Sequence, residues 1–280
     1  MDSDHLLAVM VLYQEFSNRK SYQQMPILEA NKYALALHTT SPQLGLVTSN
    51  FARDTRCQTW DLGRELSGQL HQHLTEFLNS QTWENLEFIA VAIGPGSFTS
   101  TRIGIVTART IAQQLDIPLF GISTLAAIAW LGKEGKEEEE GAMYQDNSGS
   151  GLSTWATPTL REQQLAIRTQ DSAHGLRPRY GNSTQIAIQM PAQRGQLYTA
   201  IYQPSIAGLG LRKILPDAVM TSDQWKQVLD TLETPLRLLE APANLGSYAR
   251  GVLELAYLDW QQGKRPNWSE VLPFYGQHPV

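Results

Sequence analysis

Residues 86–104 read LEFIAVAIGPGSFTSTRIG, and this stretch decides the fold class. The apolar run 86–93 is short and rich in Ile and Val, which is typical of a strand buried on both faces. The glycine-proline-glycine turn that follows breaks the strand, and from Ile103 onward apolar residues recur at helical spacing. The stretch therefore predicts a buried strand, a tight turn and a helix, in that order.

The turn between this strand and this helix suggests an anion site. A glycine-rich turn that leads into a helix points several backbone amides at one spot, which suits a phosphate or a carboxylate. The alternative is a close-packed corner whose glycines only satisfy backbone geometry, and spacing alone leaves both open. Ser97 and Thr99 are expected to cap the helix. The candidate anion-binding residues are Gly94, Pro95, Gly96, Ser97, Phe98, Thr99 and Arg102.

Composition limits the classes of function. The 280 residues contain 22 Lys plus Arg against 27 Asp plus Glu, a net charge of -5 that gives no electrostatic footprint for direct, high-affinity nucleic-acid binding. The single cysteine, Cys57, excludes an intramolecular disulfide, and no run approaches the ~20 apolar residues of a membrane span. We therefore expect a reducing, cytoplasmic setting. Cys57 is interpreted as a half-buried thiol rather than a nucleophile, because no His or Asn stands in a recognisable relation to it.

The order of elements predicts an α/β fold. Strands are expected at 33–40, 44–49 and 56–60, and a helix capped by Asp61 should follow, because leucines recur at helical spacing. After the strand and helix of 86–104, a fifth strand is expected at 118–122 and a helix at 123–131. The order βββαβαβα is that of a ribonuclease-H-like or actin-like half.

A second, smaller and degenerate half is expected after an insertion. Residues 133–184 contain the acidic run Glu137–Glu140 and a polar tract that predicts disorder, and a solvated linker is favoured over a metal site for that run. Strands are then expected at 186–190, 197–202 and 236–240, and helices at 223–232 and 245–262. The expected domains are an N-terminal extension, 1–31, a first subdomain, 32–132, the insertion, 133–185, and a second subdomain, 186–280.

The string GPGSFTSTRIGIVTARTIA resembles the GPGSFTGLRIG-type signature of the TsaB (YeaZ) family, and the resemblance extends to YALALHTTS, GISTLAAIA, AQRGQLY and LPFYG. It implies an actin-like ASKHA fold with two tandem halves, and a non-catalytic role in making the tRNA base threonylcarbamoyladenosine. The implied partners are the catalytic paralogue TsaD, as a heterodimer, and the TsaE ATPase, which would carry the ATP and the metal. The chain would meet tRNA only indirectly and would form a homodimer when alone.

The residues support a non-catalytic role. In TsaD-like relatives a helix carries two histidines four residues apart, and in this chain Thr124 and Ile128 align with them, neither able to ligate a metal in their place. His71 and His73 are two residues apart on one expected helix, a rotation of roughly 200°, so they are expected to face solvent. No metal-ligating or catalytic residue is expected.

The positions that handle nucleotides in ATP-using relatives are also changed. His38 stands where those relatives place an aspartate at the end of the first strand, and Pro191 replaces a later aspartate. An imidazole cannot hold Mg²⁺ as a carboxylate does. A stand-alone ATP-dependent kinase of this fold would need an acidic residue that this chain lacks. An M22-type metalloprotease, the third alternative, would need metal ligands that the chain also lacks.

The helix after the glycine-rich turn carries the candidate partner interface. Gly104, Ala108 and Ala112 recur every four residues, and such a stripe of small side chains lets a second helix approach closely. The alternative is that this face packs on the protein's own sheet. The candidate interface residues are Gly104, Ile105, Ala108, Ile111, Ala112 and Leu115.

Overall fold

The computed structural model describes residues 26–78, 83–132, 184–205, 210–232 and 235–276. The expectations for most of the N-terminal extension and for nearly all of the insertion, including Glu137–Glu140, lie outside these ranges. The described end of the extension packs on the fold, because the Leu28 side chain is 3% exposed within the main core. Across the described ranges, none of the helices combines the length and apolar composition that a bilayer crossing requires.

The first half contains a five-stranded sheet in the order β3-β2-β1-β4-β5. β2 is antiparallel to both β1 and β3, whereas β4 pairs with β1, and β5 with β4, in parallel. This mixed sheet confirms the expected βββαβαβα order. The elements are β1 (Tyr33–His38), β2 (Gln43–Ser49), β3 (Thr55–Asp61), α2 (Leu66–Phe77), β4 (Leu86–Ala92), α4 (Phe98–Leu115), β5 (Leu119–Ile122) and α5 (Thr124–Gly132).

The second half repeats the pattern with one strand fewer. Its four-stranded sheet has the order β8-β7-β6-β9, with β6 and β9 parallel. The smaller second half agrees with the sequence analysis, although β8 was not expected. The elements are β6 (Gln185–Pro191), β7 (Leu197–Pro204), β8 (Leu211–Met220), α7 (Ser222–Asp230), β9 (Leu236–Glu240) and α8 (Ala249–Gln261).

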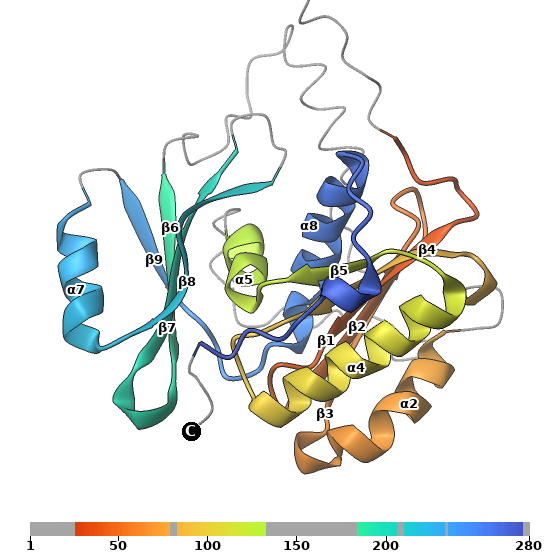
Figure 1. Ribbon diagram of the computed structural model, residues 1–280, viewed down its shortest axis with the longest axis horizontal. Helices are drawn as coiled ribbons and strands as arrows, with labels where there is room; N and C mark the ends of the chain where they lie inside the picture. The colour runs from red at the N-terminus through yellow and green to blue at the C-terminus, as the bar shows by residue number, and fades with distance from the viewer. Residues whose placement is uncertain (1–25, 79–82, 133–183, 206–209, 233–234, 277–280) are drawn as a thin grey trace, which may run out of the picture.

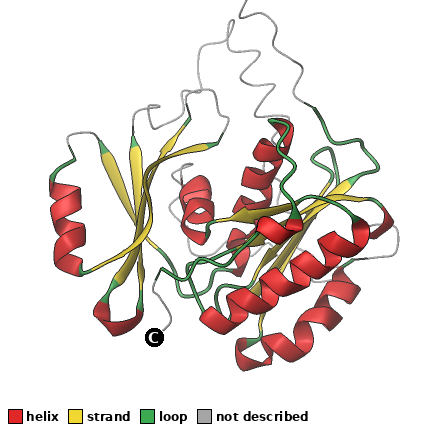
Figure 2. Ribbon diagram, in the orientation of Figure 1, coloured by secondary structure: helices red, strands yellow, loops and turns green. Residues whose placement is uncertain are grey.

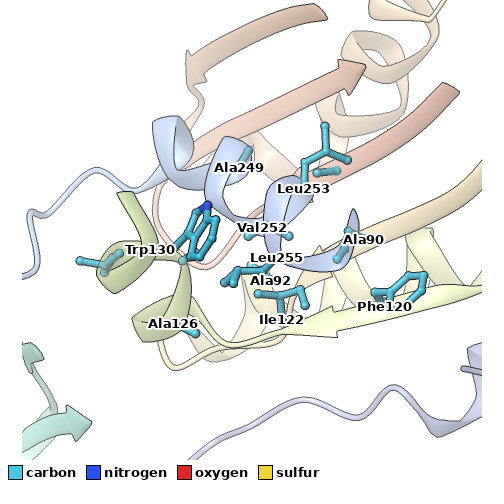
Figure 3. Close-up of a cluster of buried hydrophobic side chains, with 14 of the residues drawn as sticks. Ala90, Ala92, Phe120, Ile122, Ala126, Trp130, Ala249, Val252, Leu253 and Leu255 are labelled. Atoms are coloured by element: carbon cyan, nitrogen blue, oxygen red, sulfur yellow. The ribbon is translucent and has the colours of Figure 1, made fainter. Parts of the chain in front are cut away.

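The last helix of each half lies between the two sheets, so the layers run α7, second sheet, α5 with α8, first sheet, and α2 with α4 (Figure 1; Figure 2). α8, although last in the chain, packs on β1, β2 and β4 of the first sheet, and α5 packs on β6 and β7 of the second. Figure 3 shows Ala90 and Phe120 of the first sheet in one cluster with Trp130 of α5 and Val252 of α8. Since one buried cluster contains these residues and Ile188 of β6, the two halves share a core.

The outer face of the first sheet is covered by α2 and α4. The expected leucine stripe is confirmed as internal, because Leu66, Leu70, Leu74 and Phe77 are at most 6% exposed and contact the sheet's own core cluster. Fully burying one such side chain stabilises the fold by about 1.5–3 kcal/mol. Outward from this stripe, α2 presents polar residues.

The helix caps differ from expectation. Asp61 ends β3 and accepts a hydrogen bond from the Gln43 side-chain amide at 3.0 Å, and a short 3-10 turn separates it from α2. Ser97 occupies the position before α4 but makes no side-chain cap, and Thr99 lies inside the helix. By contrast, the Ser123 hydroxyl accepts the Ala126 amide at 3.1 Å and caps α5.

Candidate functional site

The loop between β4 and α4 is a closely packed corner. The Ser97 amide, which an anion would use, donates to the Thr40 carbonyl at 2.7 Å. The Gly94 carbonyl accepts the Thr124 amide at 2.8 Å, and a Cβ on Gly96 would lie 2.2 Å from the Thr40 carbonyl oxygen. The glycines therefore allow a close approach between this loop and the turn after β1, which is the alternative that sequence spacing left open.

The loop residues expected to hold an anion differ in their exposure. Gly94 and Pro95 are buried, whereas Ser97, Phe98 and Thr99 are exposed. Arg102 is exposed one helical turn beyond Phe98, and its guanidinium carbon lies 5.2 Å from the Phe98 ring centroid. Arg102 thus lies against an aromatic ring on the outer face of α4, and its part in an anion site at this loop stays a prediction.

His38 is fully buried at the end of β1. Burial lowers the pKa of its imidazole from 6.5 to about 3, so the ring is neutral at pH 7. Neither ring nitrogen has a hydrogen-bond partner among the described residues. A neutral, enclosed imidazole can neither hold Mg²⁺ as a carboxylate does nor act as a general base on a substrate in solution.

Backbone from the second half covers the turn between β1 and β2. The Leu245 amide donates to the Ser41 hydroxyl at 3.1 Å, and the Gly246 amide donates to the Gln43 side-chain oxygen at 3.0 Å. A Cβ on Gly45 would lie only 1.9 Å from the Gly246 carbonyl oxygen. The turn that handles metal and phosphates in ATP-using relatives is therefore in direct contact with protein backbone.

The positions aligned with the metal-binding histidines are enclosed as well. Thr124 and Ile128 of α5 are at most 2% exposed, and the hydroxyls of Thr124 and Thr40 share a hydrogen bond at 3.1 Å. Within the described ranges, no group of three or more His, Cys, Asp or Glu side chains could hold a metal ion.

The remaining His and Cys candidates have structural surroundings. His71 is exposed, as expected, but His73 is half-buried, because its ring lies 4.7 Å from the Trp60 ring. That position corrects the expectation that both histidines face solvent. Burial raises the pKa of the Cys57 thiol to about 11, so the thiol is protonated and unreactive at pH 7.

The small-residue stripe of α4 faces inward. Ala108 and Ala112 are fully buried in the core of the first half, and a Cβ on Gly104 would lie 2.1 Å from the Thr39 hydroxyl oxygen. Ile105 is 2% exposed on the same side. The expected partner interface is therefore corrected for these four residues, and the small size of Gly104, Ala108 and Ala112 lets α4 approach its own sheet.

The outer face of the same helix carries a different stripe. Phe98 is 46% exposed, Val106 is 61% exposed, and Arg102 and Thr110 complete a row at four-residue spacing. This row is displaced from the small residues by two positions, a rotation of roughly 200°. Of the predicted interface residues, Ile111 is half-buried and Leu115 is 38% exposed, so these two remain accessible.

A groove of about 470 Å³ lies between α2 and α4, which run beside each other on the outer face of the first sheet (Figure 1). Its walls are mostly apolar, with hydroxyl groups, one imidazole and one guanidinium. None of the residues that line it is acidic. The lining residues are His71, Leu74, Thr75, Trp83, Arg102, Ile103, Val106, Thr107, Thr110 and Ile111.

Sequence reasoning assigned only Arg102 and Ile111 of this groove to a site. A signal for the others was available on α4, because Phe98, Arg102, Val106 and Thr110 share a face at four-residue spacing. Trp83 could not be placed from the sequence, because it lies before β4 and enters the groove only through the packing of the chain.

Two halves with related strand orders define the class of fold: the chain has the actin-like ASKHA fold, with protein groups filling the positions where relatives of this fold carry metal and phosphate residues. Two solved structures support the fold. YeaZ from Pseudomonas aeruginosa aligns with a TM-score of 0.56 at 18% identity over 87% of this chain and 100% of that chain. A second structure, described as an uncharacterized protein with similarity to peptidase YeaZ from Pseudomonas aeruginosa, gives 0.57 at 18% over 88% and 100%.

Sequence comparison finds related proteins. Residues 63–144 match the family model described as TsaD: tRNA N6-adenosine threonylcarbamoyltransferase. The tRNA threonylcarbamoyladenosine biosynthesis protein TsaB of Bacillus subtilis is 28% identical over 156 residues, 56% of this chain and 47% of the relative. The protein of the same description from Buchnera aphidicola is 46% identical over 48 residues, 17% and 23%. The chain is similar to TsaB (YeaZ) proteins, and it spans about half the length of the first relative and about a quarter of the second.

Proposed function

We propose that this chain is a non-catalytic subunit of the assembly that makes threonylcarbamoyladenosine in tRNA, and that it binds and stabilises a catalytic TsaD paralogue. The description of the relatives as threonylcarbamoyladenosine biosynthesis proteins supports the pathway. The observation that carries the subunit role is the groove between α2 and α4, an accessible and largely apolar surface in a chain whose metal and phosphate positions are filled.

The proposed contact surface is the groove together with the outer row of α4. Val106 is a large apolar side chain with 61% of its surface exposed, and it also lines the groove. Apolar surface that is rimmed by polar groups marks binding sites for other proteins. A pair of partner helices laid on α2 and α4 would cover it. TsaE, ATP and the metal would belong to the rest of the assembly, in a cytoplasmic setting, and tRNA would be met only indirectly.

The test uses Val106→Glu and a matched control, Leu238→Glu. Leu238 is also an exposed apolar residue, at 47%, but it lies on β9 in the second half. Co-purification with the TsaD paralogue of the same organism should be lost for Val106→Glu and retained for Leu238→Glu. Equal retention by both variants would remove the groove from the proposal.

The cellular test examines tRNA from cells depleted of this protein. The level of threonylcarbamoyladenosine should fall and should recover with the wild-type chain and with Leu238→Glu, but not with Val106→Glu. An unchanged level after depletion would overturn the functional assignment, whatever the fold.

The two other functions have specific tests of their own. A stand-alone kinase would bind Mg-ATP with micromolar affinity in calorimetry, and a metalloprotease would contain stoichiometric zinc or iron. The buried His38, the covered turn after β1 and the enclosed Thr124 weigh against both. A homodimer through the same groove is proposed for the isolated chain and would dissociate when the paralogue is added.

A further inference from the structure

The C-terminal segment 271–276 connects the two halves (Figure 1). Val271 is 6% exposed in the core beneath α2 and α4, and the Phe274 amide donates to the Ile93 carbonyl at 2.7 Å, at the end of β4. Further along, a Cβ on Gly276 would lie 2.9 Å from the Tyr198 ring of β7. The position of the intervening Tyr275 is therefore fixed on both sides.

Tyr275, Phe98 and Arg102 form a continuous stack. The Tyr275 and Phe98 ring centroids are 4.6 Å apart at an interplanar angle of 36°. The Arg102 guanidinium carbon lies 5.2 Å from the Phe98 centroid, within the range of a cation–π contact. Phe98 and Arg102 are four residues apart on α4, so their side chains lie on one face of the helix. Phe98 thus lies in contact with both Tyr275 and Arg102.

Arg102 is the fixed positive charge of the groove. None of the groove-lining residues is acidic, and within the described part of the chain no carboxylate forms an ion pair with Arg102. The net charge of the whole chain is -5, so a guanidinium in a carboxylate-free groove is a local reversal of charge. A partner segment that complements this groove would be apolar and would carry a carboxylate at one end.

We propose that Tyr275 is a positioning residue that acts through Phe98 to hold Arg102 ready for a carboxylate on a partner helix docked in the groove. This inference rests on the proposed function, because the helix belongs to the TsaD paralogue. An exposed arginine samples many rotamers, and holding it in one arrangement before binding reduces the entropy lost when the ion pair forms. The C-terminal segment therefore contributes to affinity without contacting the partner helix.

The test measures the affinity of the purified TsaD paralogue for five variants at low and high salt. Arg102→Ala should weaken binding about tenfold and make the remaining affinity less dependent on salt. Tyr275→Ala should weaken it several-fold, whereas Tyr275→Phe, which keeps the ring contact, should bind as the wild type. Leu272→Ala, at a 64% exposed position of the same segment, is the matched control and should change nothing. Arg102→Ala/Tyr275→Ala should bind no more weakly than Arg102→Ala alone.

The outcomes separate the two proposals. If the wild-type chain does not bind the paralogue, the proposed function fails and this inference fails with it. If the wild type binds but Tyr275→Ala binds equally well, or weakens binding by the same factor with and without Arg102, only the positioning role is overturned.

A second measurement needs no partner. The Nε–H group of Arg102 can be followed by ¹⁵N relaxation in the isolated chain. The order parameter of this N–H bond should fall in Tyr275→Ala and remain at the wild-type value in Tyr275→Phe and Leu272→Ala. Equal order parameters in the wild type and the three variants would overturn the positioning role even if the affinities differed.

Discussion

Acidification should destabilise this protein through His38. The imidazole is fully buried, and its pKa is lowered from 6.5 to about 3 in the folded chain. Between these two values the unfolded chain takes up a proton that the folded chain does not. The buried imidazole therefore costs the folded chain almost no stability above about pH 6.5, and the cost grows as the pH falls toward 3.

The size of the effect follows from the same values. At pH 5 protonation of His38 in the unfolded chain lowers the free energy of unfolding by about 2 kcal/mol. This figure is ~1.36 kcal/mol per pH unit multiplied by the ~1.5 units that separate pH 5 from the unfolded pKa. At pH 7 the contribution is close to zero. His38→Asn removes the titrating group, so its loss of stability between pH 7 and pH 5 should be smaller than that of the wild type by about 2 kcal/mol.

The assay is urea unfolding at both pH values for the wild type, His38→Asn and the control His71→Asn, which replaces an exposed histidine of α2. Other carboxylates and histidines titrate in all three proteins, so the comparison between variants removes their contributions. A difference below about 0.5 kcal/mol between His38→Asn and the wild type would refute the reasoning, because His38 would then titrate equally in both states.

Three further outcomes are expected. Gly104→Ala should destabilise the fold by about 1–3 kcal/mol in urea unfolding, because the added Cβ would lie 2.1 Å from the Thr39 hydroxyl oxygen. Gly68→Ala on α2, with open space around it, is the control and should stabilise the fold by ~0.5–1 kcal/mol. Equal effects of the two substitutions would contradict the close approach of α4 to the sheet. Cys57, whose pKa is about 11, should react with a disulfide reagent at pH 8 at least about a hundredfold more slowly than free cysteine, and rapid labelling would show that the thiol is not enclosed. Tyr202→Phe should lower the free energy of unfolding by ~1–3 kcal/mol and raise the pKa of Asp217 further, because it removes the hydroxyl that donates to this half-buried carboxylate. An unchanged titration of Asp217, followed by NMR, would argue against that hydrogen bond.

The local elements were largely predictable from the sequence. The apolar run before the glycine-rich turn forms β4, and the leucine stripe of α2 is buried as its spacing predicts. β8 was missed because its sequence, LRKILPDAVM, does not alternate. The register against β7 shifts between the Ile201–Leu215 and Thr199–Ala218 pairs, and Pro216 lies in this irregularity, where the missing amide is tolerated.

The candidate site was predicted less well than the fold. The helical spacing of α4 contains two rows, the small residues around Ala108 and the larger ones around Val106, and periodicity does not say which row faces the sheet. Packing decides the question, because only the small row allows α4 to approach Thr39 at the end of β1. For the same reason the crossing of α8 to the first sheet could not be predicted, since it depends on contacts between segments far apart in the chain.

The helix pair between the two sheets restricts how the molecule can move. Closure of a two-lobed enzyme around a ligand requires one lobe to rotate or slide relative to the other. In this chain a Cβ on Gly251 would lie 2.7 Å from the Ala127 carbonyl oxygen, and the Trp130 indole donates to the Glu254 carboxylate at 2.6 Å across the same helix pair. Rotation would break both contacts. The contacts between α5 and α8 therefore oppose rotation of one half against the other and favour a single arrangement of the two sheets.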